Sequence, residues 1–372
     1  MSTLAVDAIV DSSNGNTTTI NGTTPTAYNT MGKNRIINGA MEIDQRNAGA
    51  SVSTSSGSAV YTLDRWNALY SQTSKFTVQQ NAGSVTSAVG FKNYLGVTSS
   101  SAYSVGATDF FSIRQLFEGF NTSDLEWGTA NAKSITVSFK VYSSLTGTFG
   151  GAIQNHNGTR SYPFSYTISS ANTWTDINVT IAGDTSGSWN GATNGIGLQV
   201  MFSLGAGSTY SGTAGSWSTT QYFTSTGATS VVGTSGATFY ITGVQLEVGS
   251  VATEFERRPY GTELALCQRY FYKTNPDNTQ FRIGGLSGNM YSSTAGVMDM
   301  ELPVRMRAVP SLARGGTYDS IYIAGIDGGA SCNFALVQTG VDKVWVEISS
   351  SSAGANGYAL HYNGQLSISA EL

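Results

Sequence analysis

The chain has 372 residues, a length that suggests about two or three domains. Charged residues make up only 11% of it, against a usual ~25%, and the formal net charge of −4 comes without a basic stripe. Such a chain is not expected to bind nucleic acid electrostatically. Its many Gly, Ser and Thr residues favour strands joined by turns and disfavour a helical or doubly wound α/β enzyme.

Signals for membranes, disulfides and zinc are missing from the sequence. No stretch stays apolar for the ~18 residues that a spanning helix needs, and the N-terminus lacks a basic region followed by an apolar one. Cys267, Cys332, His156 and His361 do not cluster. We expect a soluble protein without membrane insertion, secretion signal, disulfide framework or zinc site.

Residues 1–33 differ from the rest of the chain. A short alternating stretch with Leu4, Val6, Ile9 and Val10 is followed by DSSNGNTTTINGTTPTAYNT, which holds almost no core material. Such a segment cannot bury itself. We predict an arm that becomes ordered against a partner and attaches the chain through those four apolar residues.

Residues 34–260 contain short alternating segments between Gly-, Ser- and Asn-rich turns. Apolar residues occupy every second position in segments such as 135–141 and 196–202. This period of two indicates strands with one buried face. Many such strands without helical periodicity predict a jelly-roll-type β-sandwich. In 238–248 the inward-facing set shifts at Gly243, which predicts a β-bulge.

One helix is predicted after the sandwich. Thr262 is a favourable N-cap, and Leu264, Cys267 and Phe271 then share one face before the sequence NPD stops the run. We interpret residues 261–277 as a short connector helix.

Residues 278–372 return to the β pattern. Val344, Val346 and Ile348 alternate with other residues, and Asn363-Gly364, the favoured pair for a type I′ turn, lies between YALHY and QLSISA. We predict a second, smaller β-domain that ends in a hairpin.

Motifs for catalysis are largely missing. The sequence holds no P-loop, no GxGxxG that opens a helix, no HExxH and no nucleophile elbow. Its best acidic cluster is Glu118, Asp124 and Glu126 in FEGFNTSDLEW. Two carboxylates beside a cleft are what glycoside hydrolysis requires, so a glycan depolymerase remains an alternative, while a solvated loop anchored by Trp127 explains the same residues. We expect no enzymatic activity.

Aromatic residues give the strongest hint of a ligand. The chain has 6 Trp, 19 Tyr and 16 Phe, and ring faces that stack on the CH groups of sugars are a common means of glycan binding. Core packing is the alternative role for each ring. The candidates for glycan binding are Trp189, Trp217, Tyr318, Tyr322, Trp345, Tyr358 and Tyr362.

Three blocks, NRIINGAMEIDQRN (34–47), YTLDRW (61–66) and GVQLEVGSVATEFERRPYGTELALCQRYFYK (243–273), resemble segments of phage tail-fibre and related virion proteins. The arm MSTLAVDAIVDSSNG is similar to the N-termini of such proteins from marine and cyanobacterial phages. ELPVRMRAVPSL (301–312) is similar to the segment that opens their C-terminal β-domain. The block at 243–273 is the specific one, whereas 75–240 shares only the general β pattern.

The resemblance implies a virion structural protein: a homotrimeric, non-enzymatic tail fibre that is assembled in the host cytoplasm. Residues 1–33 would attach it to other tail or virion proteins, and the domain at 278–372 would be the one that binds host-surface glycan. A head fibre or decoration protein without a ligand site is the alternative. In either case Asp64, Arg65 and Trp66 would form a buried structural group, with Arg65 paired to a carboxylate such as Glu42 or Glu247.

Asn38-Gly39-Ala40-Met41-Glu42 is also similar to the first strand of carbohydrate-binding jelly rolls, whose Glu can ligate a structural calcium together with an Asp of the last strand. Here Met41 stands at a Phe position, and Thr242-Gly243 stands where that Asp would help. Glu42 is therefore a metal candidate without its second ligand, and no other cofactor is expected.

Overall fold

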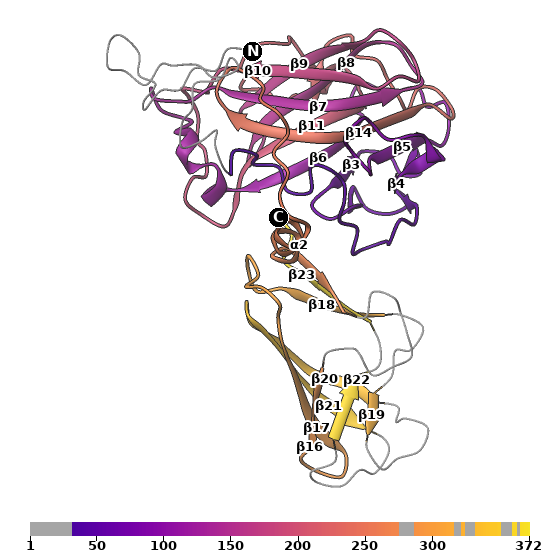
Figure 1. The fold of residues 1–372 in the computed structure, drawn as a ribbon, viewed down its shortest axis with the longest axis vertical. Coiled ribbons are helices and arrows are strands. Elements are labelled where there is room, and N and C mark those ends of the chain that lie inside the picture. Colours follow the sequence, from indigo (N-terminus) through magenta and orange to yellow (C-terminus); the bar gives the residue numbers. More distant parts are fainter. Residues whose placement is uncertain (1–31, 275–285, 316–320, 324–331, 351–358, 363–364) are drawn as a thin grey trace, which may run out of the picture.

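The structure is a computed structural model that describes residues 32–274, 286–315, 321–323, 332–350, 359–362 and 365–372. Within these ranges the chain forms a large β-sandwich, a smaller β-unit and one α-helix between them (Figure 1). The predicted all-β class, with sandwich, helix and smaller β-unit in that order, is confirmed. The predicted attachment residues Leu4, Val6, Ile9 and Val10 lie outside the described residues.

The large sandwich consists of two six-stranded sheets in which neighbouring strands are antiparallel. The first sheet contains, in spatial order, β1 (Val52–Ser53), β4 (Phe76–Gln80), β5 (Leu95–Ser99), β14 (Thr238–Val248), β7 (Ile135–Ser143) and β10 (Thr175–Ile181). The second contains β2 (Ala59–Tyr61), β3 (Asn67–Tyr70), β6 (Phe110–Glu118), β11 (Ile196–Ala206), β8 (Gly147–Asn155) and β9 (Ser161–Ile168). A single hydrophobic core fills the space between them.

Short elements connect these strands. They are the 3₁₀ turns η1 (Ala82–Ser84), η2 (Gly119–Asn121), η3 (Ser123–Leu125) and η4 (Ser208–Tyr210), and the parallel pair β12 (Ser211–Gly212) and β13 (Thr224–Ser225). β13 lies over β8 and β9 of the second sheet. It contributes to covering the outer face of that sheet, where Gln154 Nε2 donates to the carbonyl of Tyr222 at 2.6 Å.

The predicted alternation builds the core of the large sandwich. In β7, Ile135, Val137 and Val141 are completely buried, whereas Ser138 and Lys140 are partly exposed. Because successive side chains of a strand point to opposite faces, the apolar set of β7 faces the second sheet and the polar set faces outward.

The predicted bulge lies in β14. Its register with β7 shifts between Thr242 and Gln245, and Gly243 has a φ of 60°. The extra residue lets Ile241 and Val244 both point into the core, where both are completely buried.

The smaller unit packs a six-stranded sheet against a three-stranded one. The larger sheet contains β19 (Ile321–Ile323), β22 (Ala359–Tyr362), β16 (Ser287–Met290), β17 (Ala295–Glu301), β21 (Lys343–Ser350) and β20 (Cys332–Thr339). The other contains β15 (Phe271–Lys273), β23 (Gln365–Ser369) and β18 (Ser311–Gly315). Met298, Val346 and Ile368 are completely buried in their shared core.

The predicted terminal hairpin is wrong. β22 pairs with β16 and β19, whereas β23 pairs with β15 and β18, so the two strands lie in different sheets. The Asn363-Gly364 turn itself is outside the described residues. Leu360 and Leu366 reach the same core from these two different sheets.

Helix α2 (Tyr260–Gln268) starts two residues before the predicted N-cap, with the Pro259 carbonyl accepting hydrogen bonds from the amides of Thr262 and Glu263. It ends earlier than expected because β15 begins at Phe271. Tyr270 packs with Cys267 in place of Phe271, which is also buried, as the first residue of β15. No helix in the described ranges is long and apolar enough to cross a membrane.

The chain end lies at the junction between the large sandwich and the smaller unit, beside α2 (Figure 1). Asp64, Arg65 and Trp66 are buried, as predicted, with exposed fractions of 0%, 1% and 0%. Arg65 pairs with Glu371 and not with Glu42 or Glu247. Sequence alone gave no reason to expect the C-terminus at this position.

Candidate functional site

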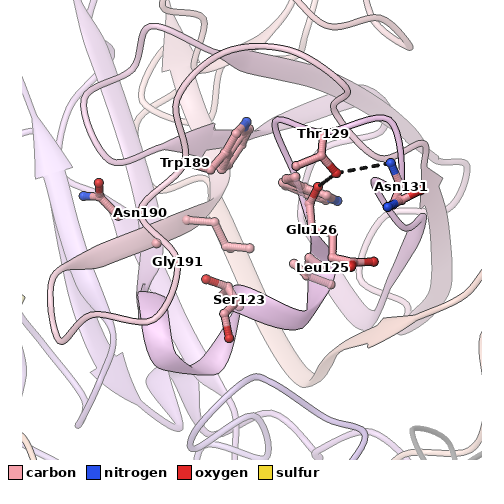
Figure 2. Close-up of a pocket in the computed structure, with 12 residues that line it drawn as sticks. Ser123, Leu125, Glu126, Thr129, Asn131, Trp189, Asn190 and Gly191 are labelled. Carbon is pink, nitrogen blue, oxygen red and sulfur yellow. Dashed lines mark hydrogen bonds between the residues drawn. The ribbon is translucent and has the colours of Figure 1, made fainter.

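A cavity of about 330 Å³ lies at one end of the large sandwich, where the β6–β7 and β10–β11 connections meet. The strand pairing brings them together, because Glu118 at the end of β6 pairs with Ile196 at the start of β11 and Ile135 at the start of β7 pairs with Ile181 at the end of β10. Figure 2 shows Trp189 on one side of the opening and Glu126 with its neighbours on the other.

Two glycines let these connections approach each other. A Cβ on Gly119 would lie 2.4 Å from the carbonyl oxygen of Asn190, and one on Gly197 would lie 2.2 Å from Thr122 Oγ1. The amide of Gly119 also donates to the carbonyl of Gly195 at 2.9 Å. A larger residue at position 119 or 197 would push the two walls of the cavity apart.

Three tryptophans cluster at one wall of the cavity: Trp127 and Trp189 line it, and Trp217 packs against both. The ring centroids of Trp127 and Trp189 are 4.7 Å apart, and those of Trp217 lie 5.3 Å from Trp127 and 5.5 Å from Trp189. All three pairs meet edge to face, a favourable arrangement of aromatic rings. Trp127 is buried, and Trp189 and Trp217 are half-buried against the sandwich core.

Hydrogen bonds fix the indole groups. Trp127 Nε1 donates to the Lys133 carbonyl at 2.7 Å, and Trp217 Nε1 donates to the Ala182 carbonyl at 2.9 Å. Trp189 Nε1 donates to Asp184 Oδ2 at 3.3 Å and to the Ser186 carbonyl at 3.2 Å. The ring of Trp189 is therefore held in place before any ligand arrives.

Asp184 is held in turn by Arg160. Arg160 Nε donates to Asp184 Oδ2 at 2.7 Å and Nη2 donates to Oδ1 at 2.6 Å, while Asp184 is only 1% exposed. The hydrogen bond to Asp184 raises the pKa of Arg160, although burial acts in the opposite direction. Since a two-pronged arginine–carboxylate pair is geometrically rigid, Arg160 and Asp184 position Trp189.

The rest of the cavity lining combines Leu125 and Leu198 with polar and nearly uncharged residues. The hydroxyl of Ser123 and the side-chain amides of Asn131 and Asn190 have no hydrogen-bond partner among the described residues. Within the part of the chain that the structure describes, Glu126 is the one charged lining residue; its side chain is 45% exposed, and its Oε2 lies 3.6 Å from Lys133 Nζ. The cavity thus combines an aromatic ring with neutral hydrogen-bonding groups.

Two of the three acidic residues considered for hydrolysis accept hydrogen bonds from arginines. Glu118 accepts hydrogen bonds from Arg269 Nε and Nη2, both at 2.8 Å. Burial by itself raises the pKa of Glu118, but the hydrogen bonds from Arg269 and Tyr270 outweigh it and the pKa is lowered. Asp124 accepts from Arg35 Nη1 at 2.8 Å and Nη2 at 2.6 Å.

Among the predicted glycan-binding residues in the described ranges, Trp189 lines this cavity and Trp217 backs it. The prediction for Tyr362 is wrong, because the inward positions of β22 are Leu360 and Tyr362, and Tyr362 is completely buried in the core of the smaller unit. Trp345 is half-buried on β21, far along the chain from the cavity, and its role stays a prediction.

The remaining predicted aromatics are not tested. Tyr318 and Tyr358 lie outside the described residues. Tyr322 belongs to β19, and the structure describes only its backbone pairing with His361. Glu42 is half-buried, and no group of three or more His, Cys, Asp or Glu residues in the described part of the chain is arranged to hold a metal ion. The calcium expectation stays a prediction.

Sequence reasoning missed Ser123, Asn131 and Asn190. These residues lie in connections without periodicity, so no pattern distinguished them from other polar loop residues. The signal that would have found them is the strand order, which places the connections 119–134 and 182–195 at the same end of the sandwich.

No family model matches the chain, and no curated protein matches it in sequence. Among solved structures it is similar to a CBM4 structure (17% identity, TM-score 0.29, covering 57% of this chain and 98% of the other). It is also similar to a family 11 carbohydrate-binding module of a Clostridium thermocellum cellulase (11%, 0.25, 56% and 99%). A third is a putative sugar binding protein from Bacteroides thetaiotaomicron (11%, 0.30, 58% and 100%). At these identities and TM-scores the similarity says nothing about what this chain binds.

Proposed function

We propose that the chain is a virion attachment protein, a phage tail fibre, whose large sandwich binds a neutral host-surface glycan at the Trp189 cavity without cleaving it. The observation that carries the glycan part is the pairing of a fixed, half-exposed indole with unpartnered amide and hydroxyl groups around one cavity. The virion part, including the homotrimer and the tail location, rests on the sequence resemblance.

The chemistry of the cavity suits a saccharide. Sugars present CH groups that pack on an aromatic ring and hydroxyls that exchange hydrogen bonds with amides. Asn131, Asn190 and Ser123 supply such groups beside Trp189. A cavity of about 330 Å³ lies at the small end of the range of ligand pockets, about 300–1,000 Å³. We infer that it takes one end or one branch of a glycan.

The arrangement of the acids favours binding over hydrolysis. A glycosidase needs two carboxyl groups that flank the bond to be cleaved. Glu118 and Asp124 are each held by two hydrogen bonds from an arginine, and Glu126 is the only acid among the described residues that line the cavity. We therefore propose a binding protein and retain the depolymerase as the outcome that saccharide release would reveal.

The start of the described chain suits an attachment arm. The amides of Gly32 and Asn34 donate to the two carboxylate oxygens of Glu256, at 2.6 and 2.7 Å. Gly32 and Asn34, which directly follow the proposed arm in the sequence, are therefore fixed on the sandwich. If residues 1–31 attach the fibre, a chain without them will keep its saccharide affinity and lose incorporation into virus particles.

The test is titration of the full-length protein with neutral trisaccharides of glucose, galactose, mannose and N-acetylglucosamine. The Asn131→Ala/Asn190→Ala variant is the diagnostic one, because it leaves the tryptophan cluster intact. Each lost hydrogen bond costs about 0.5–1.5 kcal/mol, so affinity for the bound sugar should fall about tenfold. Asn178→Ala, at an exposed position of β10 that does not line the cavity, is the matched control.

Two results would point elsewhere. Equal affinity of the wild type and the Asn131→Ala/Asn190→Ala variant would remove the cavity as the binding site. No binding of any of the trisaccharides at millimolar concentration would favour the alternative of a head fibre or decoration protein without a ligand site.

A further inference from the structure

A second, larger cavity lies at the junction of the large sandwich with α2 and β15. Its volume is about 560 Å³. The sandwich contributes the segment 42–45 and Gln80, and the other side comes from one face of α2 and from Tyr272 of β15. The cavity is thus built from three parts of the chain that are far apart in sequence.

Helix α2 presents a stripe of one tyrosine, one leucine and one glutamine to this cavity. Tyr260, Leu264 and Gln268 are spaced by four residues and therefore lie on the same face of the helix. The neighbouring face carries Glu263 and Cys267, which are buried against the sandwich. The packing of that face fixes the direction in which the stripe points.

Several polar groups around the cavity have no intramolecular partner. The carboxylate of Glu42, the amide of Gln268 and the hydroxyls of Tyr260 and Tyr272 make no hydrogen bond or ion pair with any residue that the structure describes. Tyr260 is 60% exposed. The cavity lining thus combines an exposed phenol ring, a second tyrosine ring, and amide and carboxylate groups without partners within the described ranges. Such a surface can bind a ligand that carries hydroxyl groups.

Charge decides which hydroxylated ligand fits. Glu42 and Asp44 line the cavity, and the Asp44 carboxylate is occupied by the amides of Asn47 and Gly49, at 3.0 and 2.7 Å. The lining cation, Lys273, donates to the Arg46 carbonyl at 2.9 Å. An anionic sugar such as a uronic acid would therefore meet two carboxylates, whereas the hydroxyls of a neutral sugar could donate to them.

We propose that this junction cavity is a second binding site for a neutral oligosaccharide, separate from the Trp189 cavity. Tyr260 and Tyr272 provide the ring faces, Glu42 accepts hydrogen bonds from sugar hydroxyls, and Gln268 both donates and accepts. The proposal does not depend on the Trp189 cavity, because the two lining sets share no residue.

Hydrogen bonds from Gln45 connect the two walls of the junction cavity. Gln45 Nε2 donates to Asp64 Oδ1 at 2.8 Å and to the Phe271 carbonyl at 3.1 Å, which ties the sandwich wall to β15. A saccharide in the cavity would touch both sides of the junction. Its binding should therefore also stabilise the contact between the large sandwich and the smaller unit.

The experiment is calorimetric titration of the full-length protein with neutral trisaccharides of glucose, galactose, mannose and N-acetylglucosamine, and with tri-galacturonic acid. We expect a neutral sugar to bind and the anionic one not to bind at this site. Tyr260→Ala and Glu42→Gln should each weaken the junction site about tenfold. Thr262→Ala, an exposed position on α2 that does not line the cavity, should leave the affinity unchanged.

Variants separate this site from the other one. In Asn131→Ala/Asn190→Ala protein, binding that is still lost on Tyr260→Ala supports the junction site even if the Trp189 cavity binds nothing. Saccharide affinity that is unchanged in both Tyr260→Ala and Glu42→Gln overturns the proposal, as does binding of no neutral probe. Tighter binding of tri-galacturonic acid than of every neutral sugar, if lost on Tyr260→Ala, overturns the assignment to neutral saccharides.

Discussion

The guanidinium group of Arg65, between β2 and β3, forms an ion pair with the carboxylate of Glu371, the penultimate residue of the chain. Arg65 is only 1% exposed, and its Cζ lies 3.5 Å from the ring centroid of Tyr270. Its Nη2 also donates to the Leu116 carbonyl at 2.5 Å. Through the side chain of Arg65, the large sandwich therefore contacts both Tyr270, after α2, and Glu371, near the end of the chain.

Glu371→Gln should strongly destabilise the protein. The substitution leaves the charge of Arg65 buried without a carboxylate, and breaking a buried pair in this way costs about 3–5 kcal/mol. Arg46 loses a partner as well, since its Nη2 lies 2.7 Å from Glu371 Oε1. The measurement is the free energy of unfolding of the full chain from urea titrations.

Asp176→Asn provides the matched control. It breaks the Lys140–Asp176 pair, in which the aspartate side chain is 73% exposed, and exposed pairs contribute at most about 1 kcal/mol. Equal effects of Glu371→Gln and Asp176→Asn would show that the Arg65–Glu371 contact does not hold the junction together.

Gly243→Ala should destabilise the sandwich for two reasons. Its φ of 60° costs a residue with a side chain about 1–2 kcal/mol, and a Cβ there would lie 2.6 Å from the ring of Phe91. Gly236→Ala isolates the first cost, because Gly236 has a φ of 73° with nothing within 4 Å of its Cβ position. The melting temperature should fall further for Gly243→Ala. Equal shifts would mean that Phe91 moves aside without cost.

The sequence predicted those parts of the fold that depend on local pattern. Alternation located β7, and the bulge at Gly243 followed from the shift of inward-facing residues along β14. The partners of the strands were less accessible. Asn363-Gly364 has the local chemistry of a hairpin, yet β22 and β23 pair with strands of different sheets that face one core.

The candidate sites were predictable only in part. Trp189 stood out because an aromatic residue in a Gly- and Ser-rich loop is unusual, but Asn131 and Asn190 carry no such signal. The junction cavity depends on Gln80 and Tyr260, which are separated by 180 positions in the sequence. Such combinations arise from tertiary contacts that no local pattern contains.

Asp64 should make stability depend on pH. Burial raises its pKa from 3.8 to about 6, with the nearby Arg46 charge acting in the opposite direction. Because the folded state holds the proton more tightly than the unfolded state, the contribution of Asp64 is complete below about pH 4 and is lost as the pH rises through about 6. The loss amounts to about 2–3 kcal/mol.

Asp64→Asn tests this dependence directly. The variant loses one of the hydrogen bonds from Gln45 at every pH, at a constant cost. The unfolding free energy of the wild type minus that of the variant should therefore fall by about 2–3 kcal/mol as the pH rises from 4 to 7. A difference that stays constant over that range would show that Asp64 is already ionised in the folded protein at pH 4.

Asp184→Asn should weaken saccharide binding at the Trp189 cavity. The substitution removes the charge that Arg160 grips, and with it the fixed acceptor for Trp189 Nε1. Loss of one hydrogen bond of about 1 kcal/mol that positions the ring corresponds to about a fivefold loss of affinity. Arg160→Lys should act in the same direction, because lysine keeps the charge and loses the two-pronged geometry. The measurement is the affinity for the neutral trisaccharide that binds best, alongside the melting temperature. If both variants lower the melting temperature while the affinity stays unchanged, Arg160 and Asp184 support the fold and do not position Trp189.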